Sequence, residues 1–322
     1  MLIDIAYDAL RTAVSTETAI FALLAISLNL QYGYTGLLNF GQVGYLMVGG
    51  YAVAITVTIA GGDFWTGTAV AVVMSVVLSL LIGVPTLRLR ADYFAITSLA
   101  IAETMRLVVR SRWLEPVTGG VDGLTRFADG FYAVNPIAAG VHAFGPWRFT
   151  ADQLFAFLVA WALAGLAALL VWRLIASPWG RVIRAIREDE DVARSVGKPV
   201  FAFKLQSLAI GGVIGALAGV VLAAHQQTVN PEGYTPVVTF YAYTALILGG
   251  AGRTLGPVAG SLIFWLILGA TDSAVARGTG GLVAGLLTPQ QIGTVRFVMV
   301  GVALMLLLLY RADGLFARKA AR

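Results

Sequence analysis

Cysteine is absent from the sequence, which excludes disulfides, thiolate nucleophiles and cysteine-based metal sites. Histidine is nearly absent. His142 lies in a long polar loop and His225 at the end of an apolar run, so neither has the neighbouring ligands that a metal site needs. We therefore expect no metal site. Charged residues make up only 12% of the chain, so the segments in which they cluster are informative.

The motifs of nucleotide binding and of common hydrolases are also missing. Gly197 and Lys198 are followed by Pro199 and lack an upstream glycine, so they do not form the GxxxxGK[ST] loop that binds ATP phosphates. Neither HExxH nor GxSxG occurs, and the acidic residues lie mostly in loops. We expect no catalytic residue, no bound cofactor and no nucleotide site on this chain.

Apolar residues dominate instead, at 58% of the 322 residues, with a mean hydropathy of +0.83. Several runs are long enough to cross a hydrocarbon core, which takes about 20 helical residues. The sequence therefore predicts an all-α fold, a polytopic integral membrane helical bundle of about 8–10 spans that forms a single transmembrane domain over residues 1–322. The candidate spans are residues 17–32, 40–60, 66–86, 92–109, 152–175, 205–224, 237–249, 257–271 and 292–310.

Basic residues place two segments in the cytoplasm. Seven lysines and arginines crowd residues 173–204, and four more follow the last apolar run, as the positive-inside rule predicts. Alternation then puts the loop 111–151 and residues 225–236 outside, and also the N-terminus if all nine runs cross. Residues 1–13 lack the basic start and cleavage site of a signal peptide, so we expect an interfacial segment there. The net charge of +5 needs no nucleic-acid partner.

A charged segment, residues 177–204, separates two of the apolar runs. Ser177 can cap a helix that starts at Pro178, and Gly197 is a stop signal, so we expect one short surface helix. Two interpretations remain open: a solvated helix that only joins two spans, and a helix that docks into a groove of a soluble partner. The positions that recur at helical spacing and predict its apolar face are Val182, Ile186, Ala193 and Val196.

Glycine and polar residues interrupt some of the apolar runs. Six glycines between residues 33 and 50, and the GGAGRTLGP segment at 249–257, predict broken or re-entrant helices of the kind that line a pathway. Close helix packing is the alternative, and it is favoured for the ridge Gly211, Gly215 and Gly219. Glu103 and Arg106 lie three residues apart in an apolar run and are expected to pair. The residues that we predict to line a pathway are Asn29, Asn39, Gln42 and Glu103.

Five stretches carry a more specific signal when they are taken in order: LNLQYGYTGLLNFGQVGY (28–45), RADYFAITSLAIAE (90–103), TGGVDGL (118–124), GRVIRAIREDEDVARSVG (180–197) and LILGGAGRTLGPVAG (246–260). Together they resemble the permease subunits of bacterial branched-chain amino-acid ABC importers, and the similarity spans nearly the whole chain. The extended outer loop with its TGG is similar to that of the longer of the two permease types.

The resemblance implies that the charged segment 177–204 is a cytoplasmic coupling helix. Permeases of ABC importers carry an EAA-then-glycine pattern there, which DVARSVG matches loosely. Asp191 stands at the acidic position, Ala193 at the second alanine and Gly197 at the glycine, whereas Val192 replaces the first alanine. The residues expected to couple to the ATPase are Arg184, Arg187, Glu188, Asp189, Glu190, Asp191, Ala193 and Gly197.

The resemblance also implies partners and a location. They are two cytoplasmic ABC ATPases that bind the ATP, a second related permease in a heterodimer, an extracytoplasmic substrate-binding protein and the membrane lipid of a bacterial inner (plasma) membrane. The implied function is the import of leucine, isoleucine and valine, with urea, short amides or aromatic acids as alternatives. A secondary transporter or channel is the alternative of another class, but it would favour acidic or histidine relays inside the membrane, where Glu103 is isolated. An integral-membrane enzyme has no motif to support it.

Overall fold

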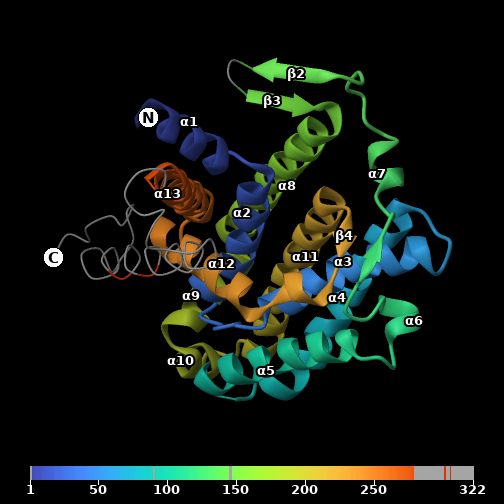
Figure 1. The fold of residues 1–322 in the computed structure, drawn as a ribbon. Coiled ribbons are helices and arrows are strands. Elements are labelled where there is room, and N and C mark those ends of the chain that lie inside the picture. The colour runs from blue at the N-terminus through green and yellow to red at the C-terminus, as the bar shows by residue number, and fades with distance from the viewer. Residues whose placement is uncertain (1, 90, 145–146, 279–300, 302–304, 306–322) are drawn as a thin grey trace.

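The computed structural model describes residues 2–89, 91–144, 147–278, 301 and 305. Helices make up nearly all of the regular structure in this part of the chain (Figure 1). The long helices are α1 (Leu2–Ala13), α2 (Thr16–Leu28), α3 (Gln42–Thr58), α4 (Phe64–Thr86), α5 (Ala91–Arg110), α8 (Ala151–Ala176), α11 (Val200–Gln226), α12 (Pro236–Gly249) and α13 (Gly256–Gly278). The shorter elements are the π-helix η1 (Asn29–Tyr34), α6 (Glu115–Thr118), α7 (Asp129–Tyr132), α9 (Pro178–Glu188), α10 (Glu190–Ser195), the 3₁₀-helix η2 (Pro231–Tyr234) and the strands β1 (Leu124–Thr125), β2 (Val141–Phe144), β3 (Trp147–Thr150) and β4 (Thr228–Val229).

Helix α2 lies at the centre of the bundle. Nearly all of its residues are buried, because α8, α11, α12 and α13 pack around it (Figure 1). Helix α3 packs against α11, and α4 covers both of them. A helix that is apolar on every side needs a partner on every side, so the uniformly apolar sequence of α2 explains its central position.

The first eight apolar runs of the sequence each coincide with a helix, whereas the ninth, residues 292–310, lies outside the described residues. Helices α4, α8 and α11 are long and apolar enough to cross a membrane. Residues Thr16–Tyr34, bent by 46° from Ile5–Ala13, form a possible fourth span with that segment, and α3 and α12 are shorter apolar helices. The all-α membrane bundle predicted from composition is thus confirmed.

The glycine ridge of α11 faces η1 and α3. A methyl group at Gly219 would overlap the backbone carbonyl of Leu46, and one at Gly211 would overlap the side chain of Gln31. Glycine therefore allows the helices to approach to backbone contact. The packing role predicted for this ridge is confirmed.

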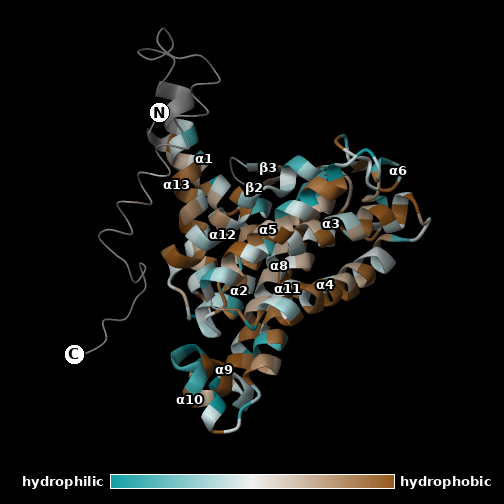
Figure 2. Ribbon diagram, turned by 90° about the horizontal axis from the view of Figure 1, so that it is seen from below, coloured by the Kyte–Doolittle hydropathy of each residue, from teal (hydrophilic) through white to brown (hydrophobic). Residues whose placement is uncertain are grey.

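The two ends of the bundle differ in character. At one end, which we call the charged end, α9 and α10 project beyond the other helices and expose hydrophilic segments (Figure 2). At the other, which we call the hairpin end, β2 pairs antiparallel with β3, so that Val141 lies opposite Thr150. Strand β1 pairs with β4 there, which ties the loop 111–151 to the end of α11. The start of α2 also lies at the hairpin end, where it lines a pocket together with β3.

Candidate functional site

Helix α9 is fixed to the end of α8. Ser177 occupies the cap position in an extended conformation, and Pro178 takes the first helical position as expected. The Ser177 hydroxyl donates to the Leu174 carbonyl at 2.6 Å instead of capping α9. The guanidinium of Arg184 donates to the carbonyls of Gly180 and Ile175 at 3.1 and 3.2 Å, so it satisfies acceptors at the α8–α9 corner.

The single helix expected between Ser177 and Gly197 is wrong, because the helix breaks at Asp189. That residue adopts φ −154° and ψ 111°, and its carboxylate accepts hydrogen bonds from the backbone of Asp191 and Val192 at 2.9 and 3.0 Å. It therefore caps a second helix, α10, which ends before Gly197 at φ +77°. A short carboxylate can compete with the helix for backbone N–H groups, which is the physical reason for the break.

The break changes which apolar side chains face inward. Ile183, Ile186 and Ala193 are buried, and Val200 of α11 joins Ile186 and Ala193 in one cluster. The prediction for Ile186 and Ala193 is correct, but Val196 is 67% exposed because α10 does not continue the phase of α9. Together with Val192, which is 59% exposed, Val196 gives α10 an apolar outer surface.

An ion-pair chain ties α10 to α11. The carboxylate of Glu190 pairs with Lys204 of α11 and, at 2.9 Å, with Arg194. Arg194 also pairs with Asp191 at 2.8 Å. The two pairs of Arg194 are exposed and contribute about 0–1 kcal/mol each, so they orient α10 more than they stabilise the fold. Glu188, Asp189 and Asp191 are exposed at the outer surface of the α9–α10 unit.

Arg187 connects the α9–α10 unit to the π-helix at the end of α2. Its guanidinium donates to the backbone carbonyl of Gly33, in the last turn of η1, where carbonyls lack a helical partner. Asn29, at the start of η1, donates to the Arg253 carbonyl at 2.8 Å and accepts from the Gly252 N–H at 2.7 Å. We call Arg187, η1 and residues 250–256 the junction.

Space in the junction is tight. A Cβ on Gly33 would lie 2.6 Å from the Gly252 nitrogen and would overlap the Asn29 side chain. Gly252 and Gly250 have φ of +80° and +91°, a region that favours glycine. The GGAGRTLGP segment therefore forms a tight turn between α12 and α13 that fits against η1. π-helical turns are rare and are frequently found at functional sites.

A buried polar network connects η1 to α2, α3 and α11. Asn39 donates to Gln31 and Gln42 at 2.9 and 3.2 Å, and Gln42 donates to Ser27 at 2.7 Å. Ser27 in turn donates to the carbonyl of Gly211 at 2.6 Å. Every member is buried, so the low local dielectric strengthens each bond and makes any loss costly.

The four residues predicted to line a pathway are divided between two places. Asn29, Asn39 and Gln42 are buried and form hydrogen bonds within the bundle. Glu103 lies on α5 and binds Arg106 at 2.6 Å, which confirms the predicted pair. Arg106 lies 3.7 Å from Glu232 of η2, so the pair extends to the hairpin end. Whether these residues line a pathway stays a prediction.

Sequence reasoning missed the partners of these residues. Gly33, Gly252 and Ile183 were not among the expected functional positions, although the glycine-rich segments that contain two of them were noted as unusual. Among the residues that the structure describes, no cluster of three or more potential metal ligands occurs. The site consists of an anchored helix pair, a tight glycine turn and a buried hydrogen-bond network, an arrangement that can transmit movement from α9 into the bundle.

Comparison with known proteins identifies the family. Residues 10–309 match the family described as branched-chain amino acid transport system / permease component. The chain is 29% identical over 318 residues to the LivM permease protein of a high-affinity branched-chain amino acid transport system from Salmonella typhimurium, covering 94% of this chain and 69% of that protein. It is 30% identical over 266 residues to the Escherichia coli LivM protein, covering 78% of this chain and 61% of that protein.

A third relative comes from an archaeon. The probable LivM permease protein of Methanocaldococcus jannaschii is 26% identical over 334 residues, covering 93% of this chain and 91% of that protein. The family match extends over nearly the whole chain, including the junction and the α9–α10 unit. The chain is therefore a multi-pass membrane protein that belongs to the family of branched-chain amino acid transport system permease components.

Proposed function

We propose that the chain is the permease subunit of an ABC importer that moves leucine, isoleucine and valine across a bacterial inner membrane. The α9–α10 unit carries this proposal. Its inner face is anchored to the bundle through Ile183, Ile186 and Ala193, whereas its outer surface exposes charged residues and two valines. An exposed helix with an apolar strip and a charged rim has the chemistry of a helix that docks into a groove.

In this proposal two cytoplasmic ABC ATPases supply the energy. They receive the charged end, which places that end in the cytoplasm and the hairpin end outside. Val192 and Val196 enter a groove on the ATPase, and Glu188, Asp189 and Asp191 form the charged rim around it. The chain itself binds no nucleotide and no cofactor, which agrees with its lack of a phosphate-binding loop.

Two further partners complete the importer. A second, related permease forms a heterodimer with this chain, and an extracytoplasmic binding protein delivers the substrate to the hairpin end. Residues 1–322 act as one transmembrane domain, with the coupling segment at 177–204 and the extracytoplasmic loop at 111–151.

The junction is the route by which movement enters the bundle. When the ATPase moves α9, Arg187 displaces the end of η1, and Asn29 carries the displacement to residues 250–256. The polar network around Asn39 and Gln42 also starts at η1, through Gln31, and its hydrogen bonds re-form in the second state of the permease. Coupling requires that the ATPase hold α9 differently in its two states, because a partner without differential affinity shifts nothing.

Uptake by reconstituted vesicles tests the proposal. Vesicles carrying this chain with its cognate partners are expected to accumulate labelled leucine only with ATP, and unlabelled isoleucine and valine are expected to compete. If ATP drives only urea or benzoate uptake, the substrate assignment is wrong and the importer class stands. If leucine enters without the ATPases, the chain is a secondary transporter or channel and the role of α9–α10 is wrong.

A further inference from the structure

A cavity at the hairpin end has no role in the proposed transport cycle. It has a volume of about 500 Å³ and lies between the α1–α2 corner, strand β3, the start of α8 and the end of α11. Volumes of roughly 300–1,000 Å³ are typical of sites for small molecules. We call it the corner pocket.

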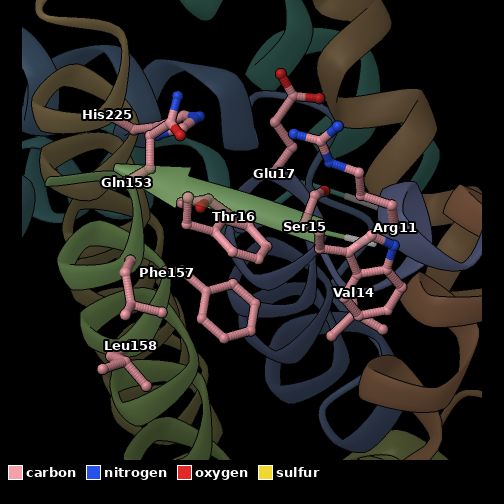
Figure 3. Close-up of a pocket in the computed structure, with 12 residues that line it drawn as sticks. Arg11, Val14, Ser15, Thr16, Glu17, Gln153, Phe157, Leu158 and His225 are labelled. Atoms are coloured by element: carbon pink, nitrogen blue, oxygen red, sulfur yellow. The ribbon is translucent and has the colours of Figure 1, made fainter. Parts of the chain in front are cut away.

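The polar residues of the corner pocket lie at its rim. Figure 3 shows the Arg11 guanidinium and the Glu17 carboxylate on one side of the opening, with His225 and Gln153 on the other. Arg11 and Glu17 are exposed, and neither forms an ion pair with another residue that the structure describes. The rim therefore offers one cationic and one anionic group to a ligand.

The body of the pocket is apolar. Phe157 and Leu158 lie along α8, away from the charged rim (Figure 3), and Phe149 of β3 also lines the cavity. The buried indole N–H of Trp147, another lining residue, has no hydrogen-bond acceptor among the described residues. A ligand oxygen beside Trp147 would satisfy this donor.

The pocket lies at the depth of a lipid head group and the first part of an acyl chain. Helix α8 has 26 residues, which corresponds to a length of about 39 Å and exceeds a hydrocarbon core of about 30 Å. Its first turn therefore lies in the head-group region, and Leu158 lies about two turns deeper. Leu158 is 51% exposed, as are leucines 166 and 169 further along the same helix at 62% and 45%, and we expect this side of α8 to face lipid.

We propose that the corner pocket binds a phospholipid whose head group carries both a phosphate and a primary ammonium, as in phosphatidylethanolamine. The acyl chain lies against Phe157 and Leu158 and leaves the pocket along the lipid-facing side of α8. Arg11 binds the phosphate, and Glu17 binds the ammonium. The lipid comes from the leaflet at the hairpin end, opposite the α9–α10 unit.

The opposite charges at the rim determine lipid preference. Phosphatidylglycerol offers a phosphate to Arg11 but no cation to Glu17, so the uncompensated carboxylate disfavours it. The pocket is therefore expected to prefer phosphatidylethanolamine over phosphatidylglycerol by up to about fivefold, as one exposed charge pair allows. The α1–α2 corner would be fixed by the lipid, since Arg11 and Glu17 lie on either side of the 46° bend.

Native mass spectrometry of the purified full-length chain, titrated with phosphatidylethanolamine or phosphatidylglycerol, tests the proposal. Arg11→Gln is expected to weaken binding of both lipids, whereas Glu17→Gln is expected to remove the preference by weakening phosphatidylethanolamine binding and strengthening phosphatidylglycerol binding. Leu158→Trp, at a position exposed enough to accept the larger ring, is expected to fill the pocket and weaken both lipids. Arg112→Gln, an exposed arginine in the outer loop, is the matched control and should change neither.

Three results would overturn the proposal. The first is equal binding of the two lipids by the unmodified chain. The second is an Arg112→Gln effect as large as that of Arg11→Gln, which would indicate non-specific charge attraction. The third is displacement of bound phosphatidylethanolamine by free leucine, which would make the corner pocket an amino-acid site. None of these measurements depends on transport, so their outcome is separate from that of the proposed function.

Discussion

Replacing Asn29 by alanine tests the junction most specifically within this chain. The Asn29 side chain is 1% exposed and forms two hydrogen bonds, to the Arg253 carbonyl and from the Gly252 N–H, at 2.8 and 2.7 Å. Residues 252 and 253 are partly exposed, so water can replace part of the lost bonding. The expected loss is the net value of two hydrogen bonds, about 1–3 kcal/mol in the free energy of unfolding.

We expect Asn29→Ala to reduce the number of leucine molecules imported per ATP while the protein still folds. The Asn29→Ala complex is expected to insert, assemble and hydrolyse ATP, but to import fewer leucine molecules per ATP, because α9 no longer moves residues 250–256 through η1. Asn135→Ala is the matched control, since Asn135 also forms two hydrogen bonds, at 3.1 and 2.9 Å, but lies in the outer loop. Leucine uptake per ATP is measured in reconstituted vesicles. A normal ratio in the Asn29→Ala complex would refute the reasoning.

Three further predictions concern packing, capping and docking. Gly219→Ala forces a methyl group into a backbone carbonyl of α3 and should lower the free energy of unfolding by about 1–3 kcal/mol. Gly165→Ala, with open space around it, should not lower it, and denaturant titration compares the two variants. The pKa of Asp63, the α4 cap, is lowered from its ordinary value of 3.8 by hydrogen bonds from the first turn of the helix. The Asp63 carboxylate therefore stabilises the folded state fully above pH 3.8, and this stabilisation is lost as the pH falls below that value. Thermal unfolding against pH should show this loss in the natural chain and not in Asp63→Asn; equal profiles would contradict it. Val196→Asp should abolish ATPase binding in a pull-down without changing thermal stability. Val121→Asp, at another exposed position in the outer loop, should change neither ATPase binding nor thermal stability.

The sequence was sufficient to predict where the long apolar helices lie. Long apolar runs leave a membrane-buried backbone no alternative to the helix, so the eight described runs fold as expected. The start at Pro178 and the stop at Gly197 were also predictable, because each depends on the backbone of one residue.

Contacts between distant segments could not be predicted in the same way. Asn29 binds residues more than 220 positions away, and nothing near Asn29 in the sequence specifies that partner. The break at Asp189 was missed because a carboxylate inside a helical pattern is compatible with both a continuous helix and a new cap. The corner pocket was missed because it joins α1, β3, α8 and α11, which meet only in the folded chain.

Site-specific cross-linking tests the central claim, that the ATPases act on the α9–α10 unit, most directly. Because the chain contains no cysteine, a single Val196→Cys substitution gives one reactive position on the outer surface of α10. The account predicts that this variant cross-links to the ATPase subunit in the assembled importer, with a yield that changes when ATP is added. Val121→Cys, in the loop at the opposite end, should give no such product. The account would be contradicted if Val196→Cys gave no ATPase adduct, or if Val121→Cys gave the same one.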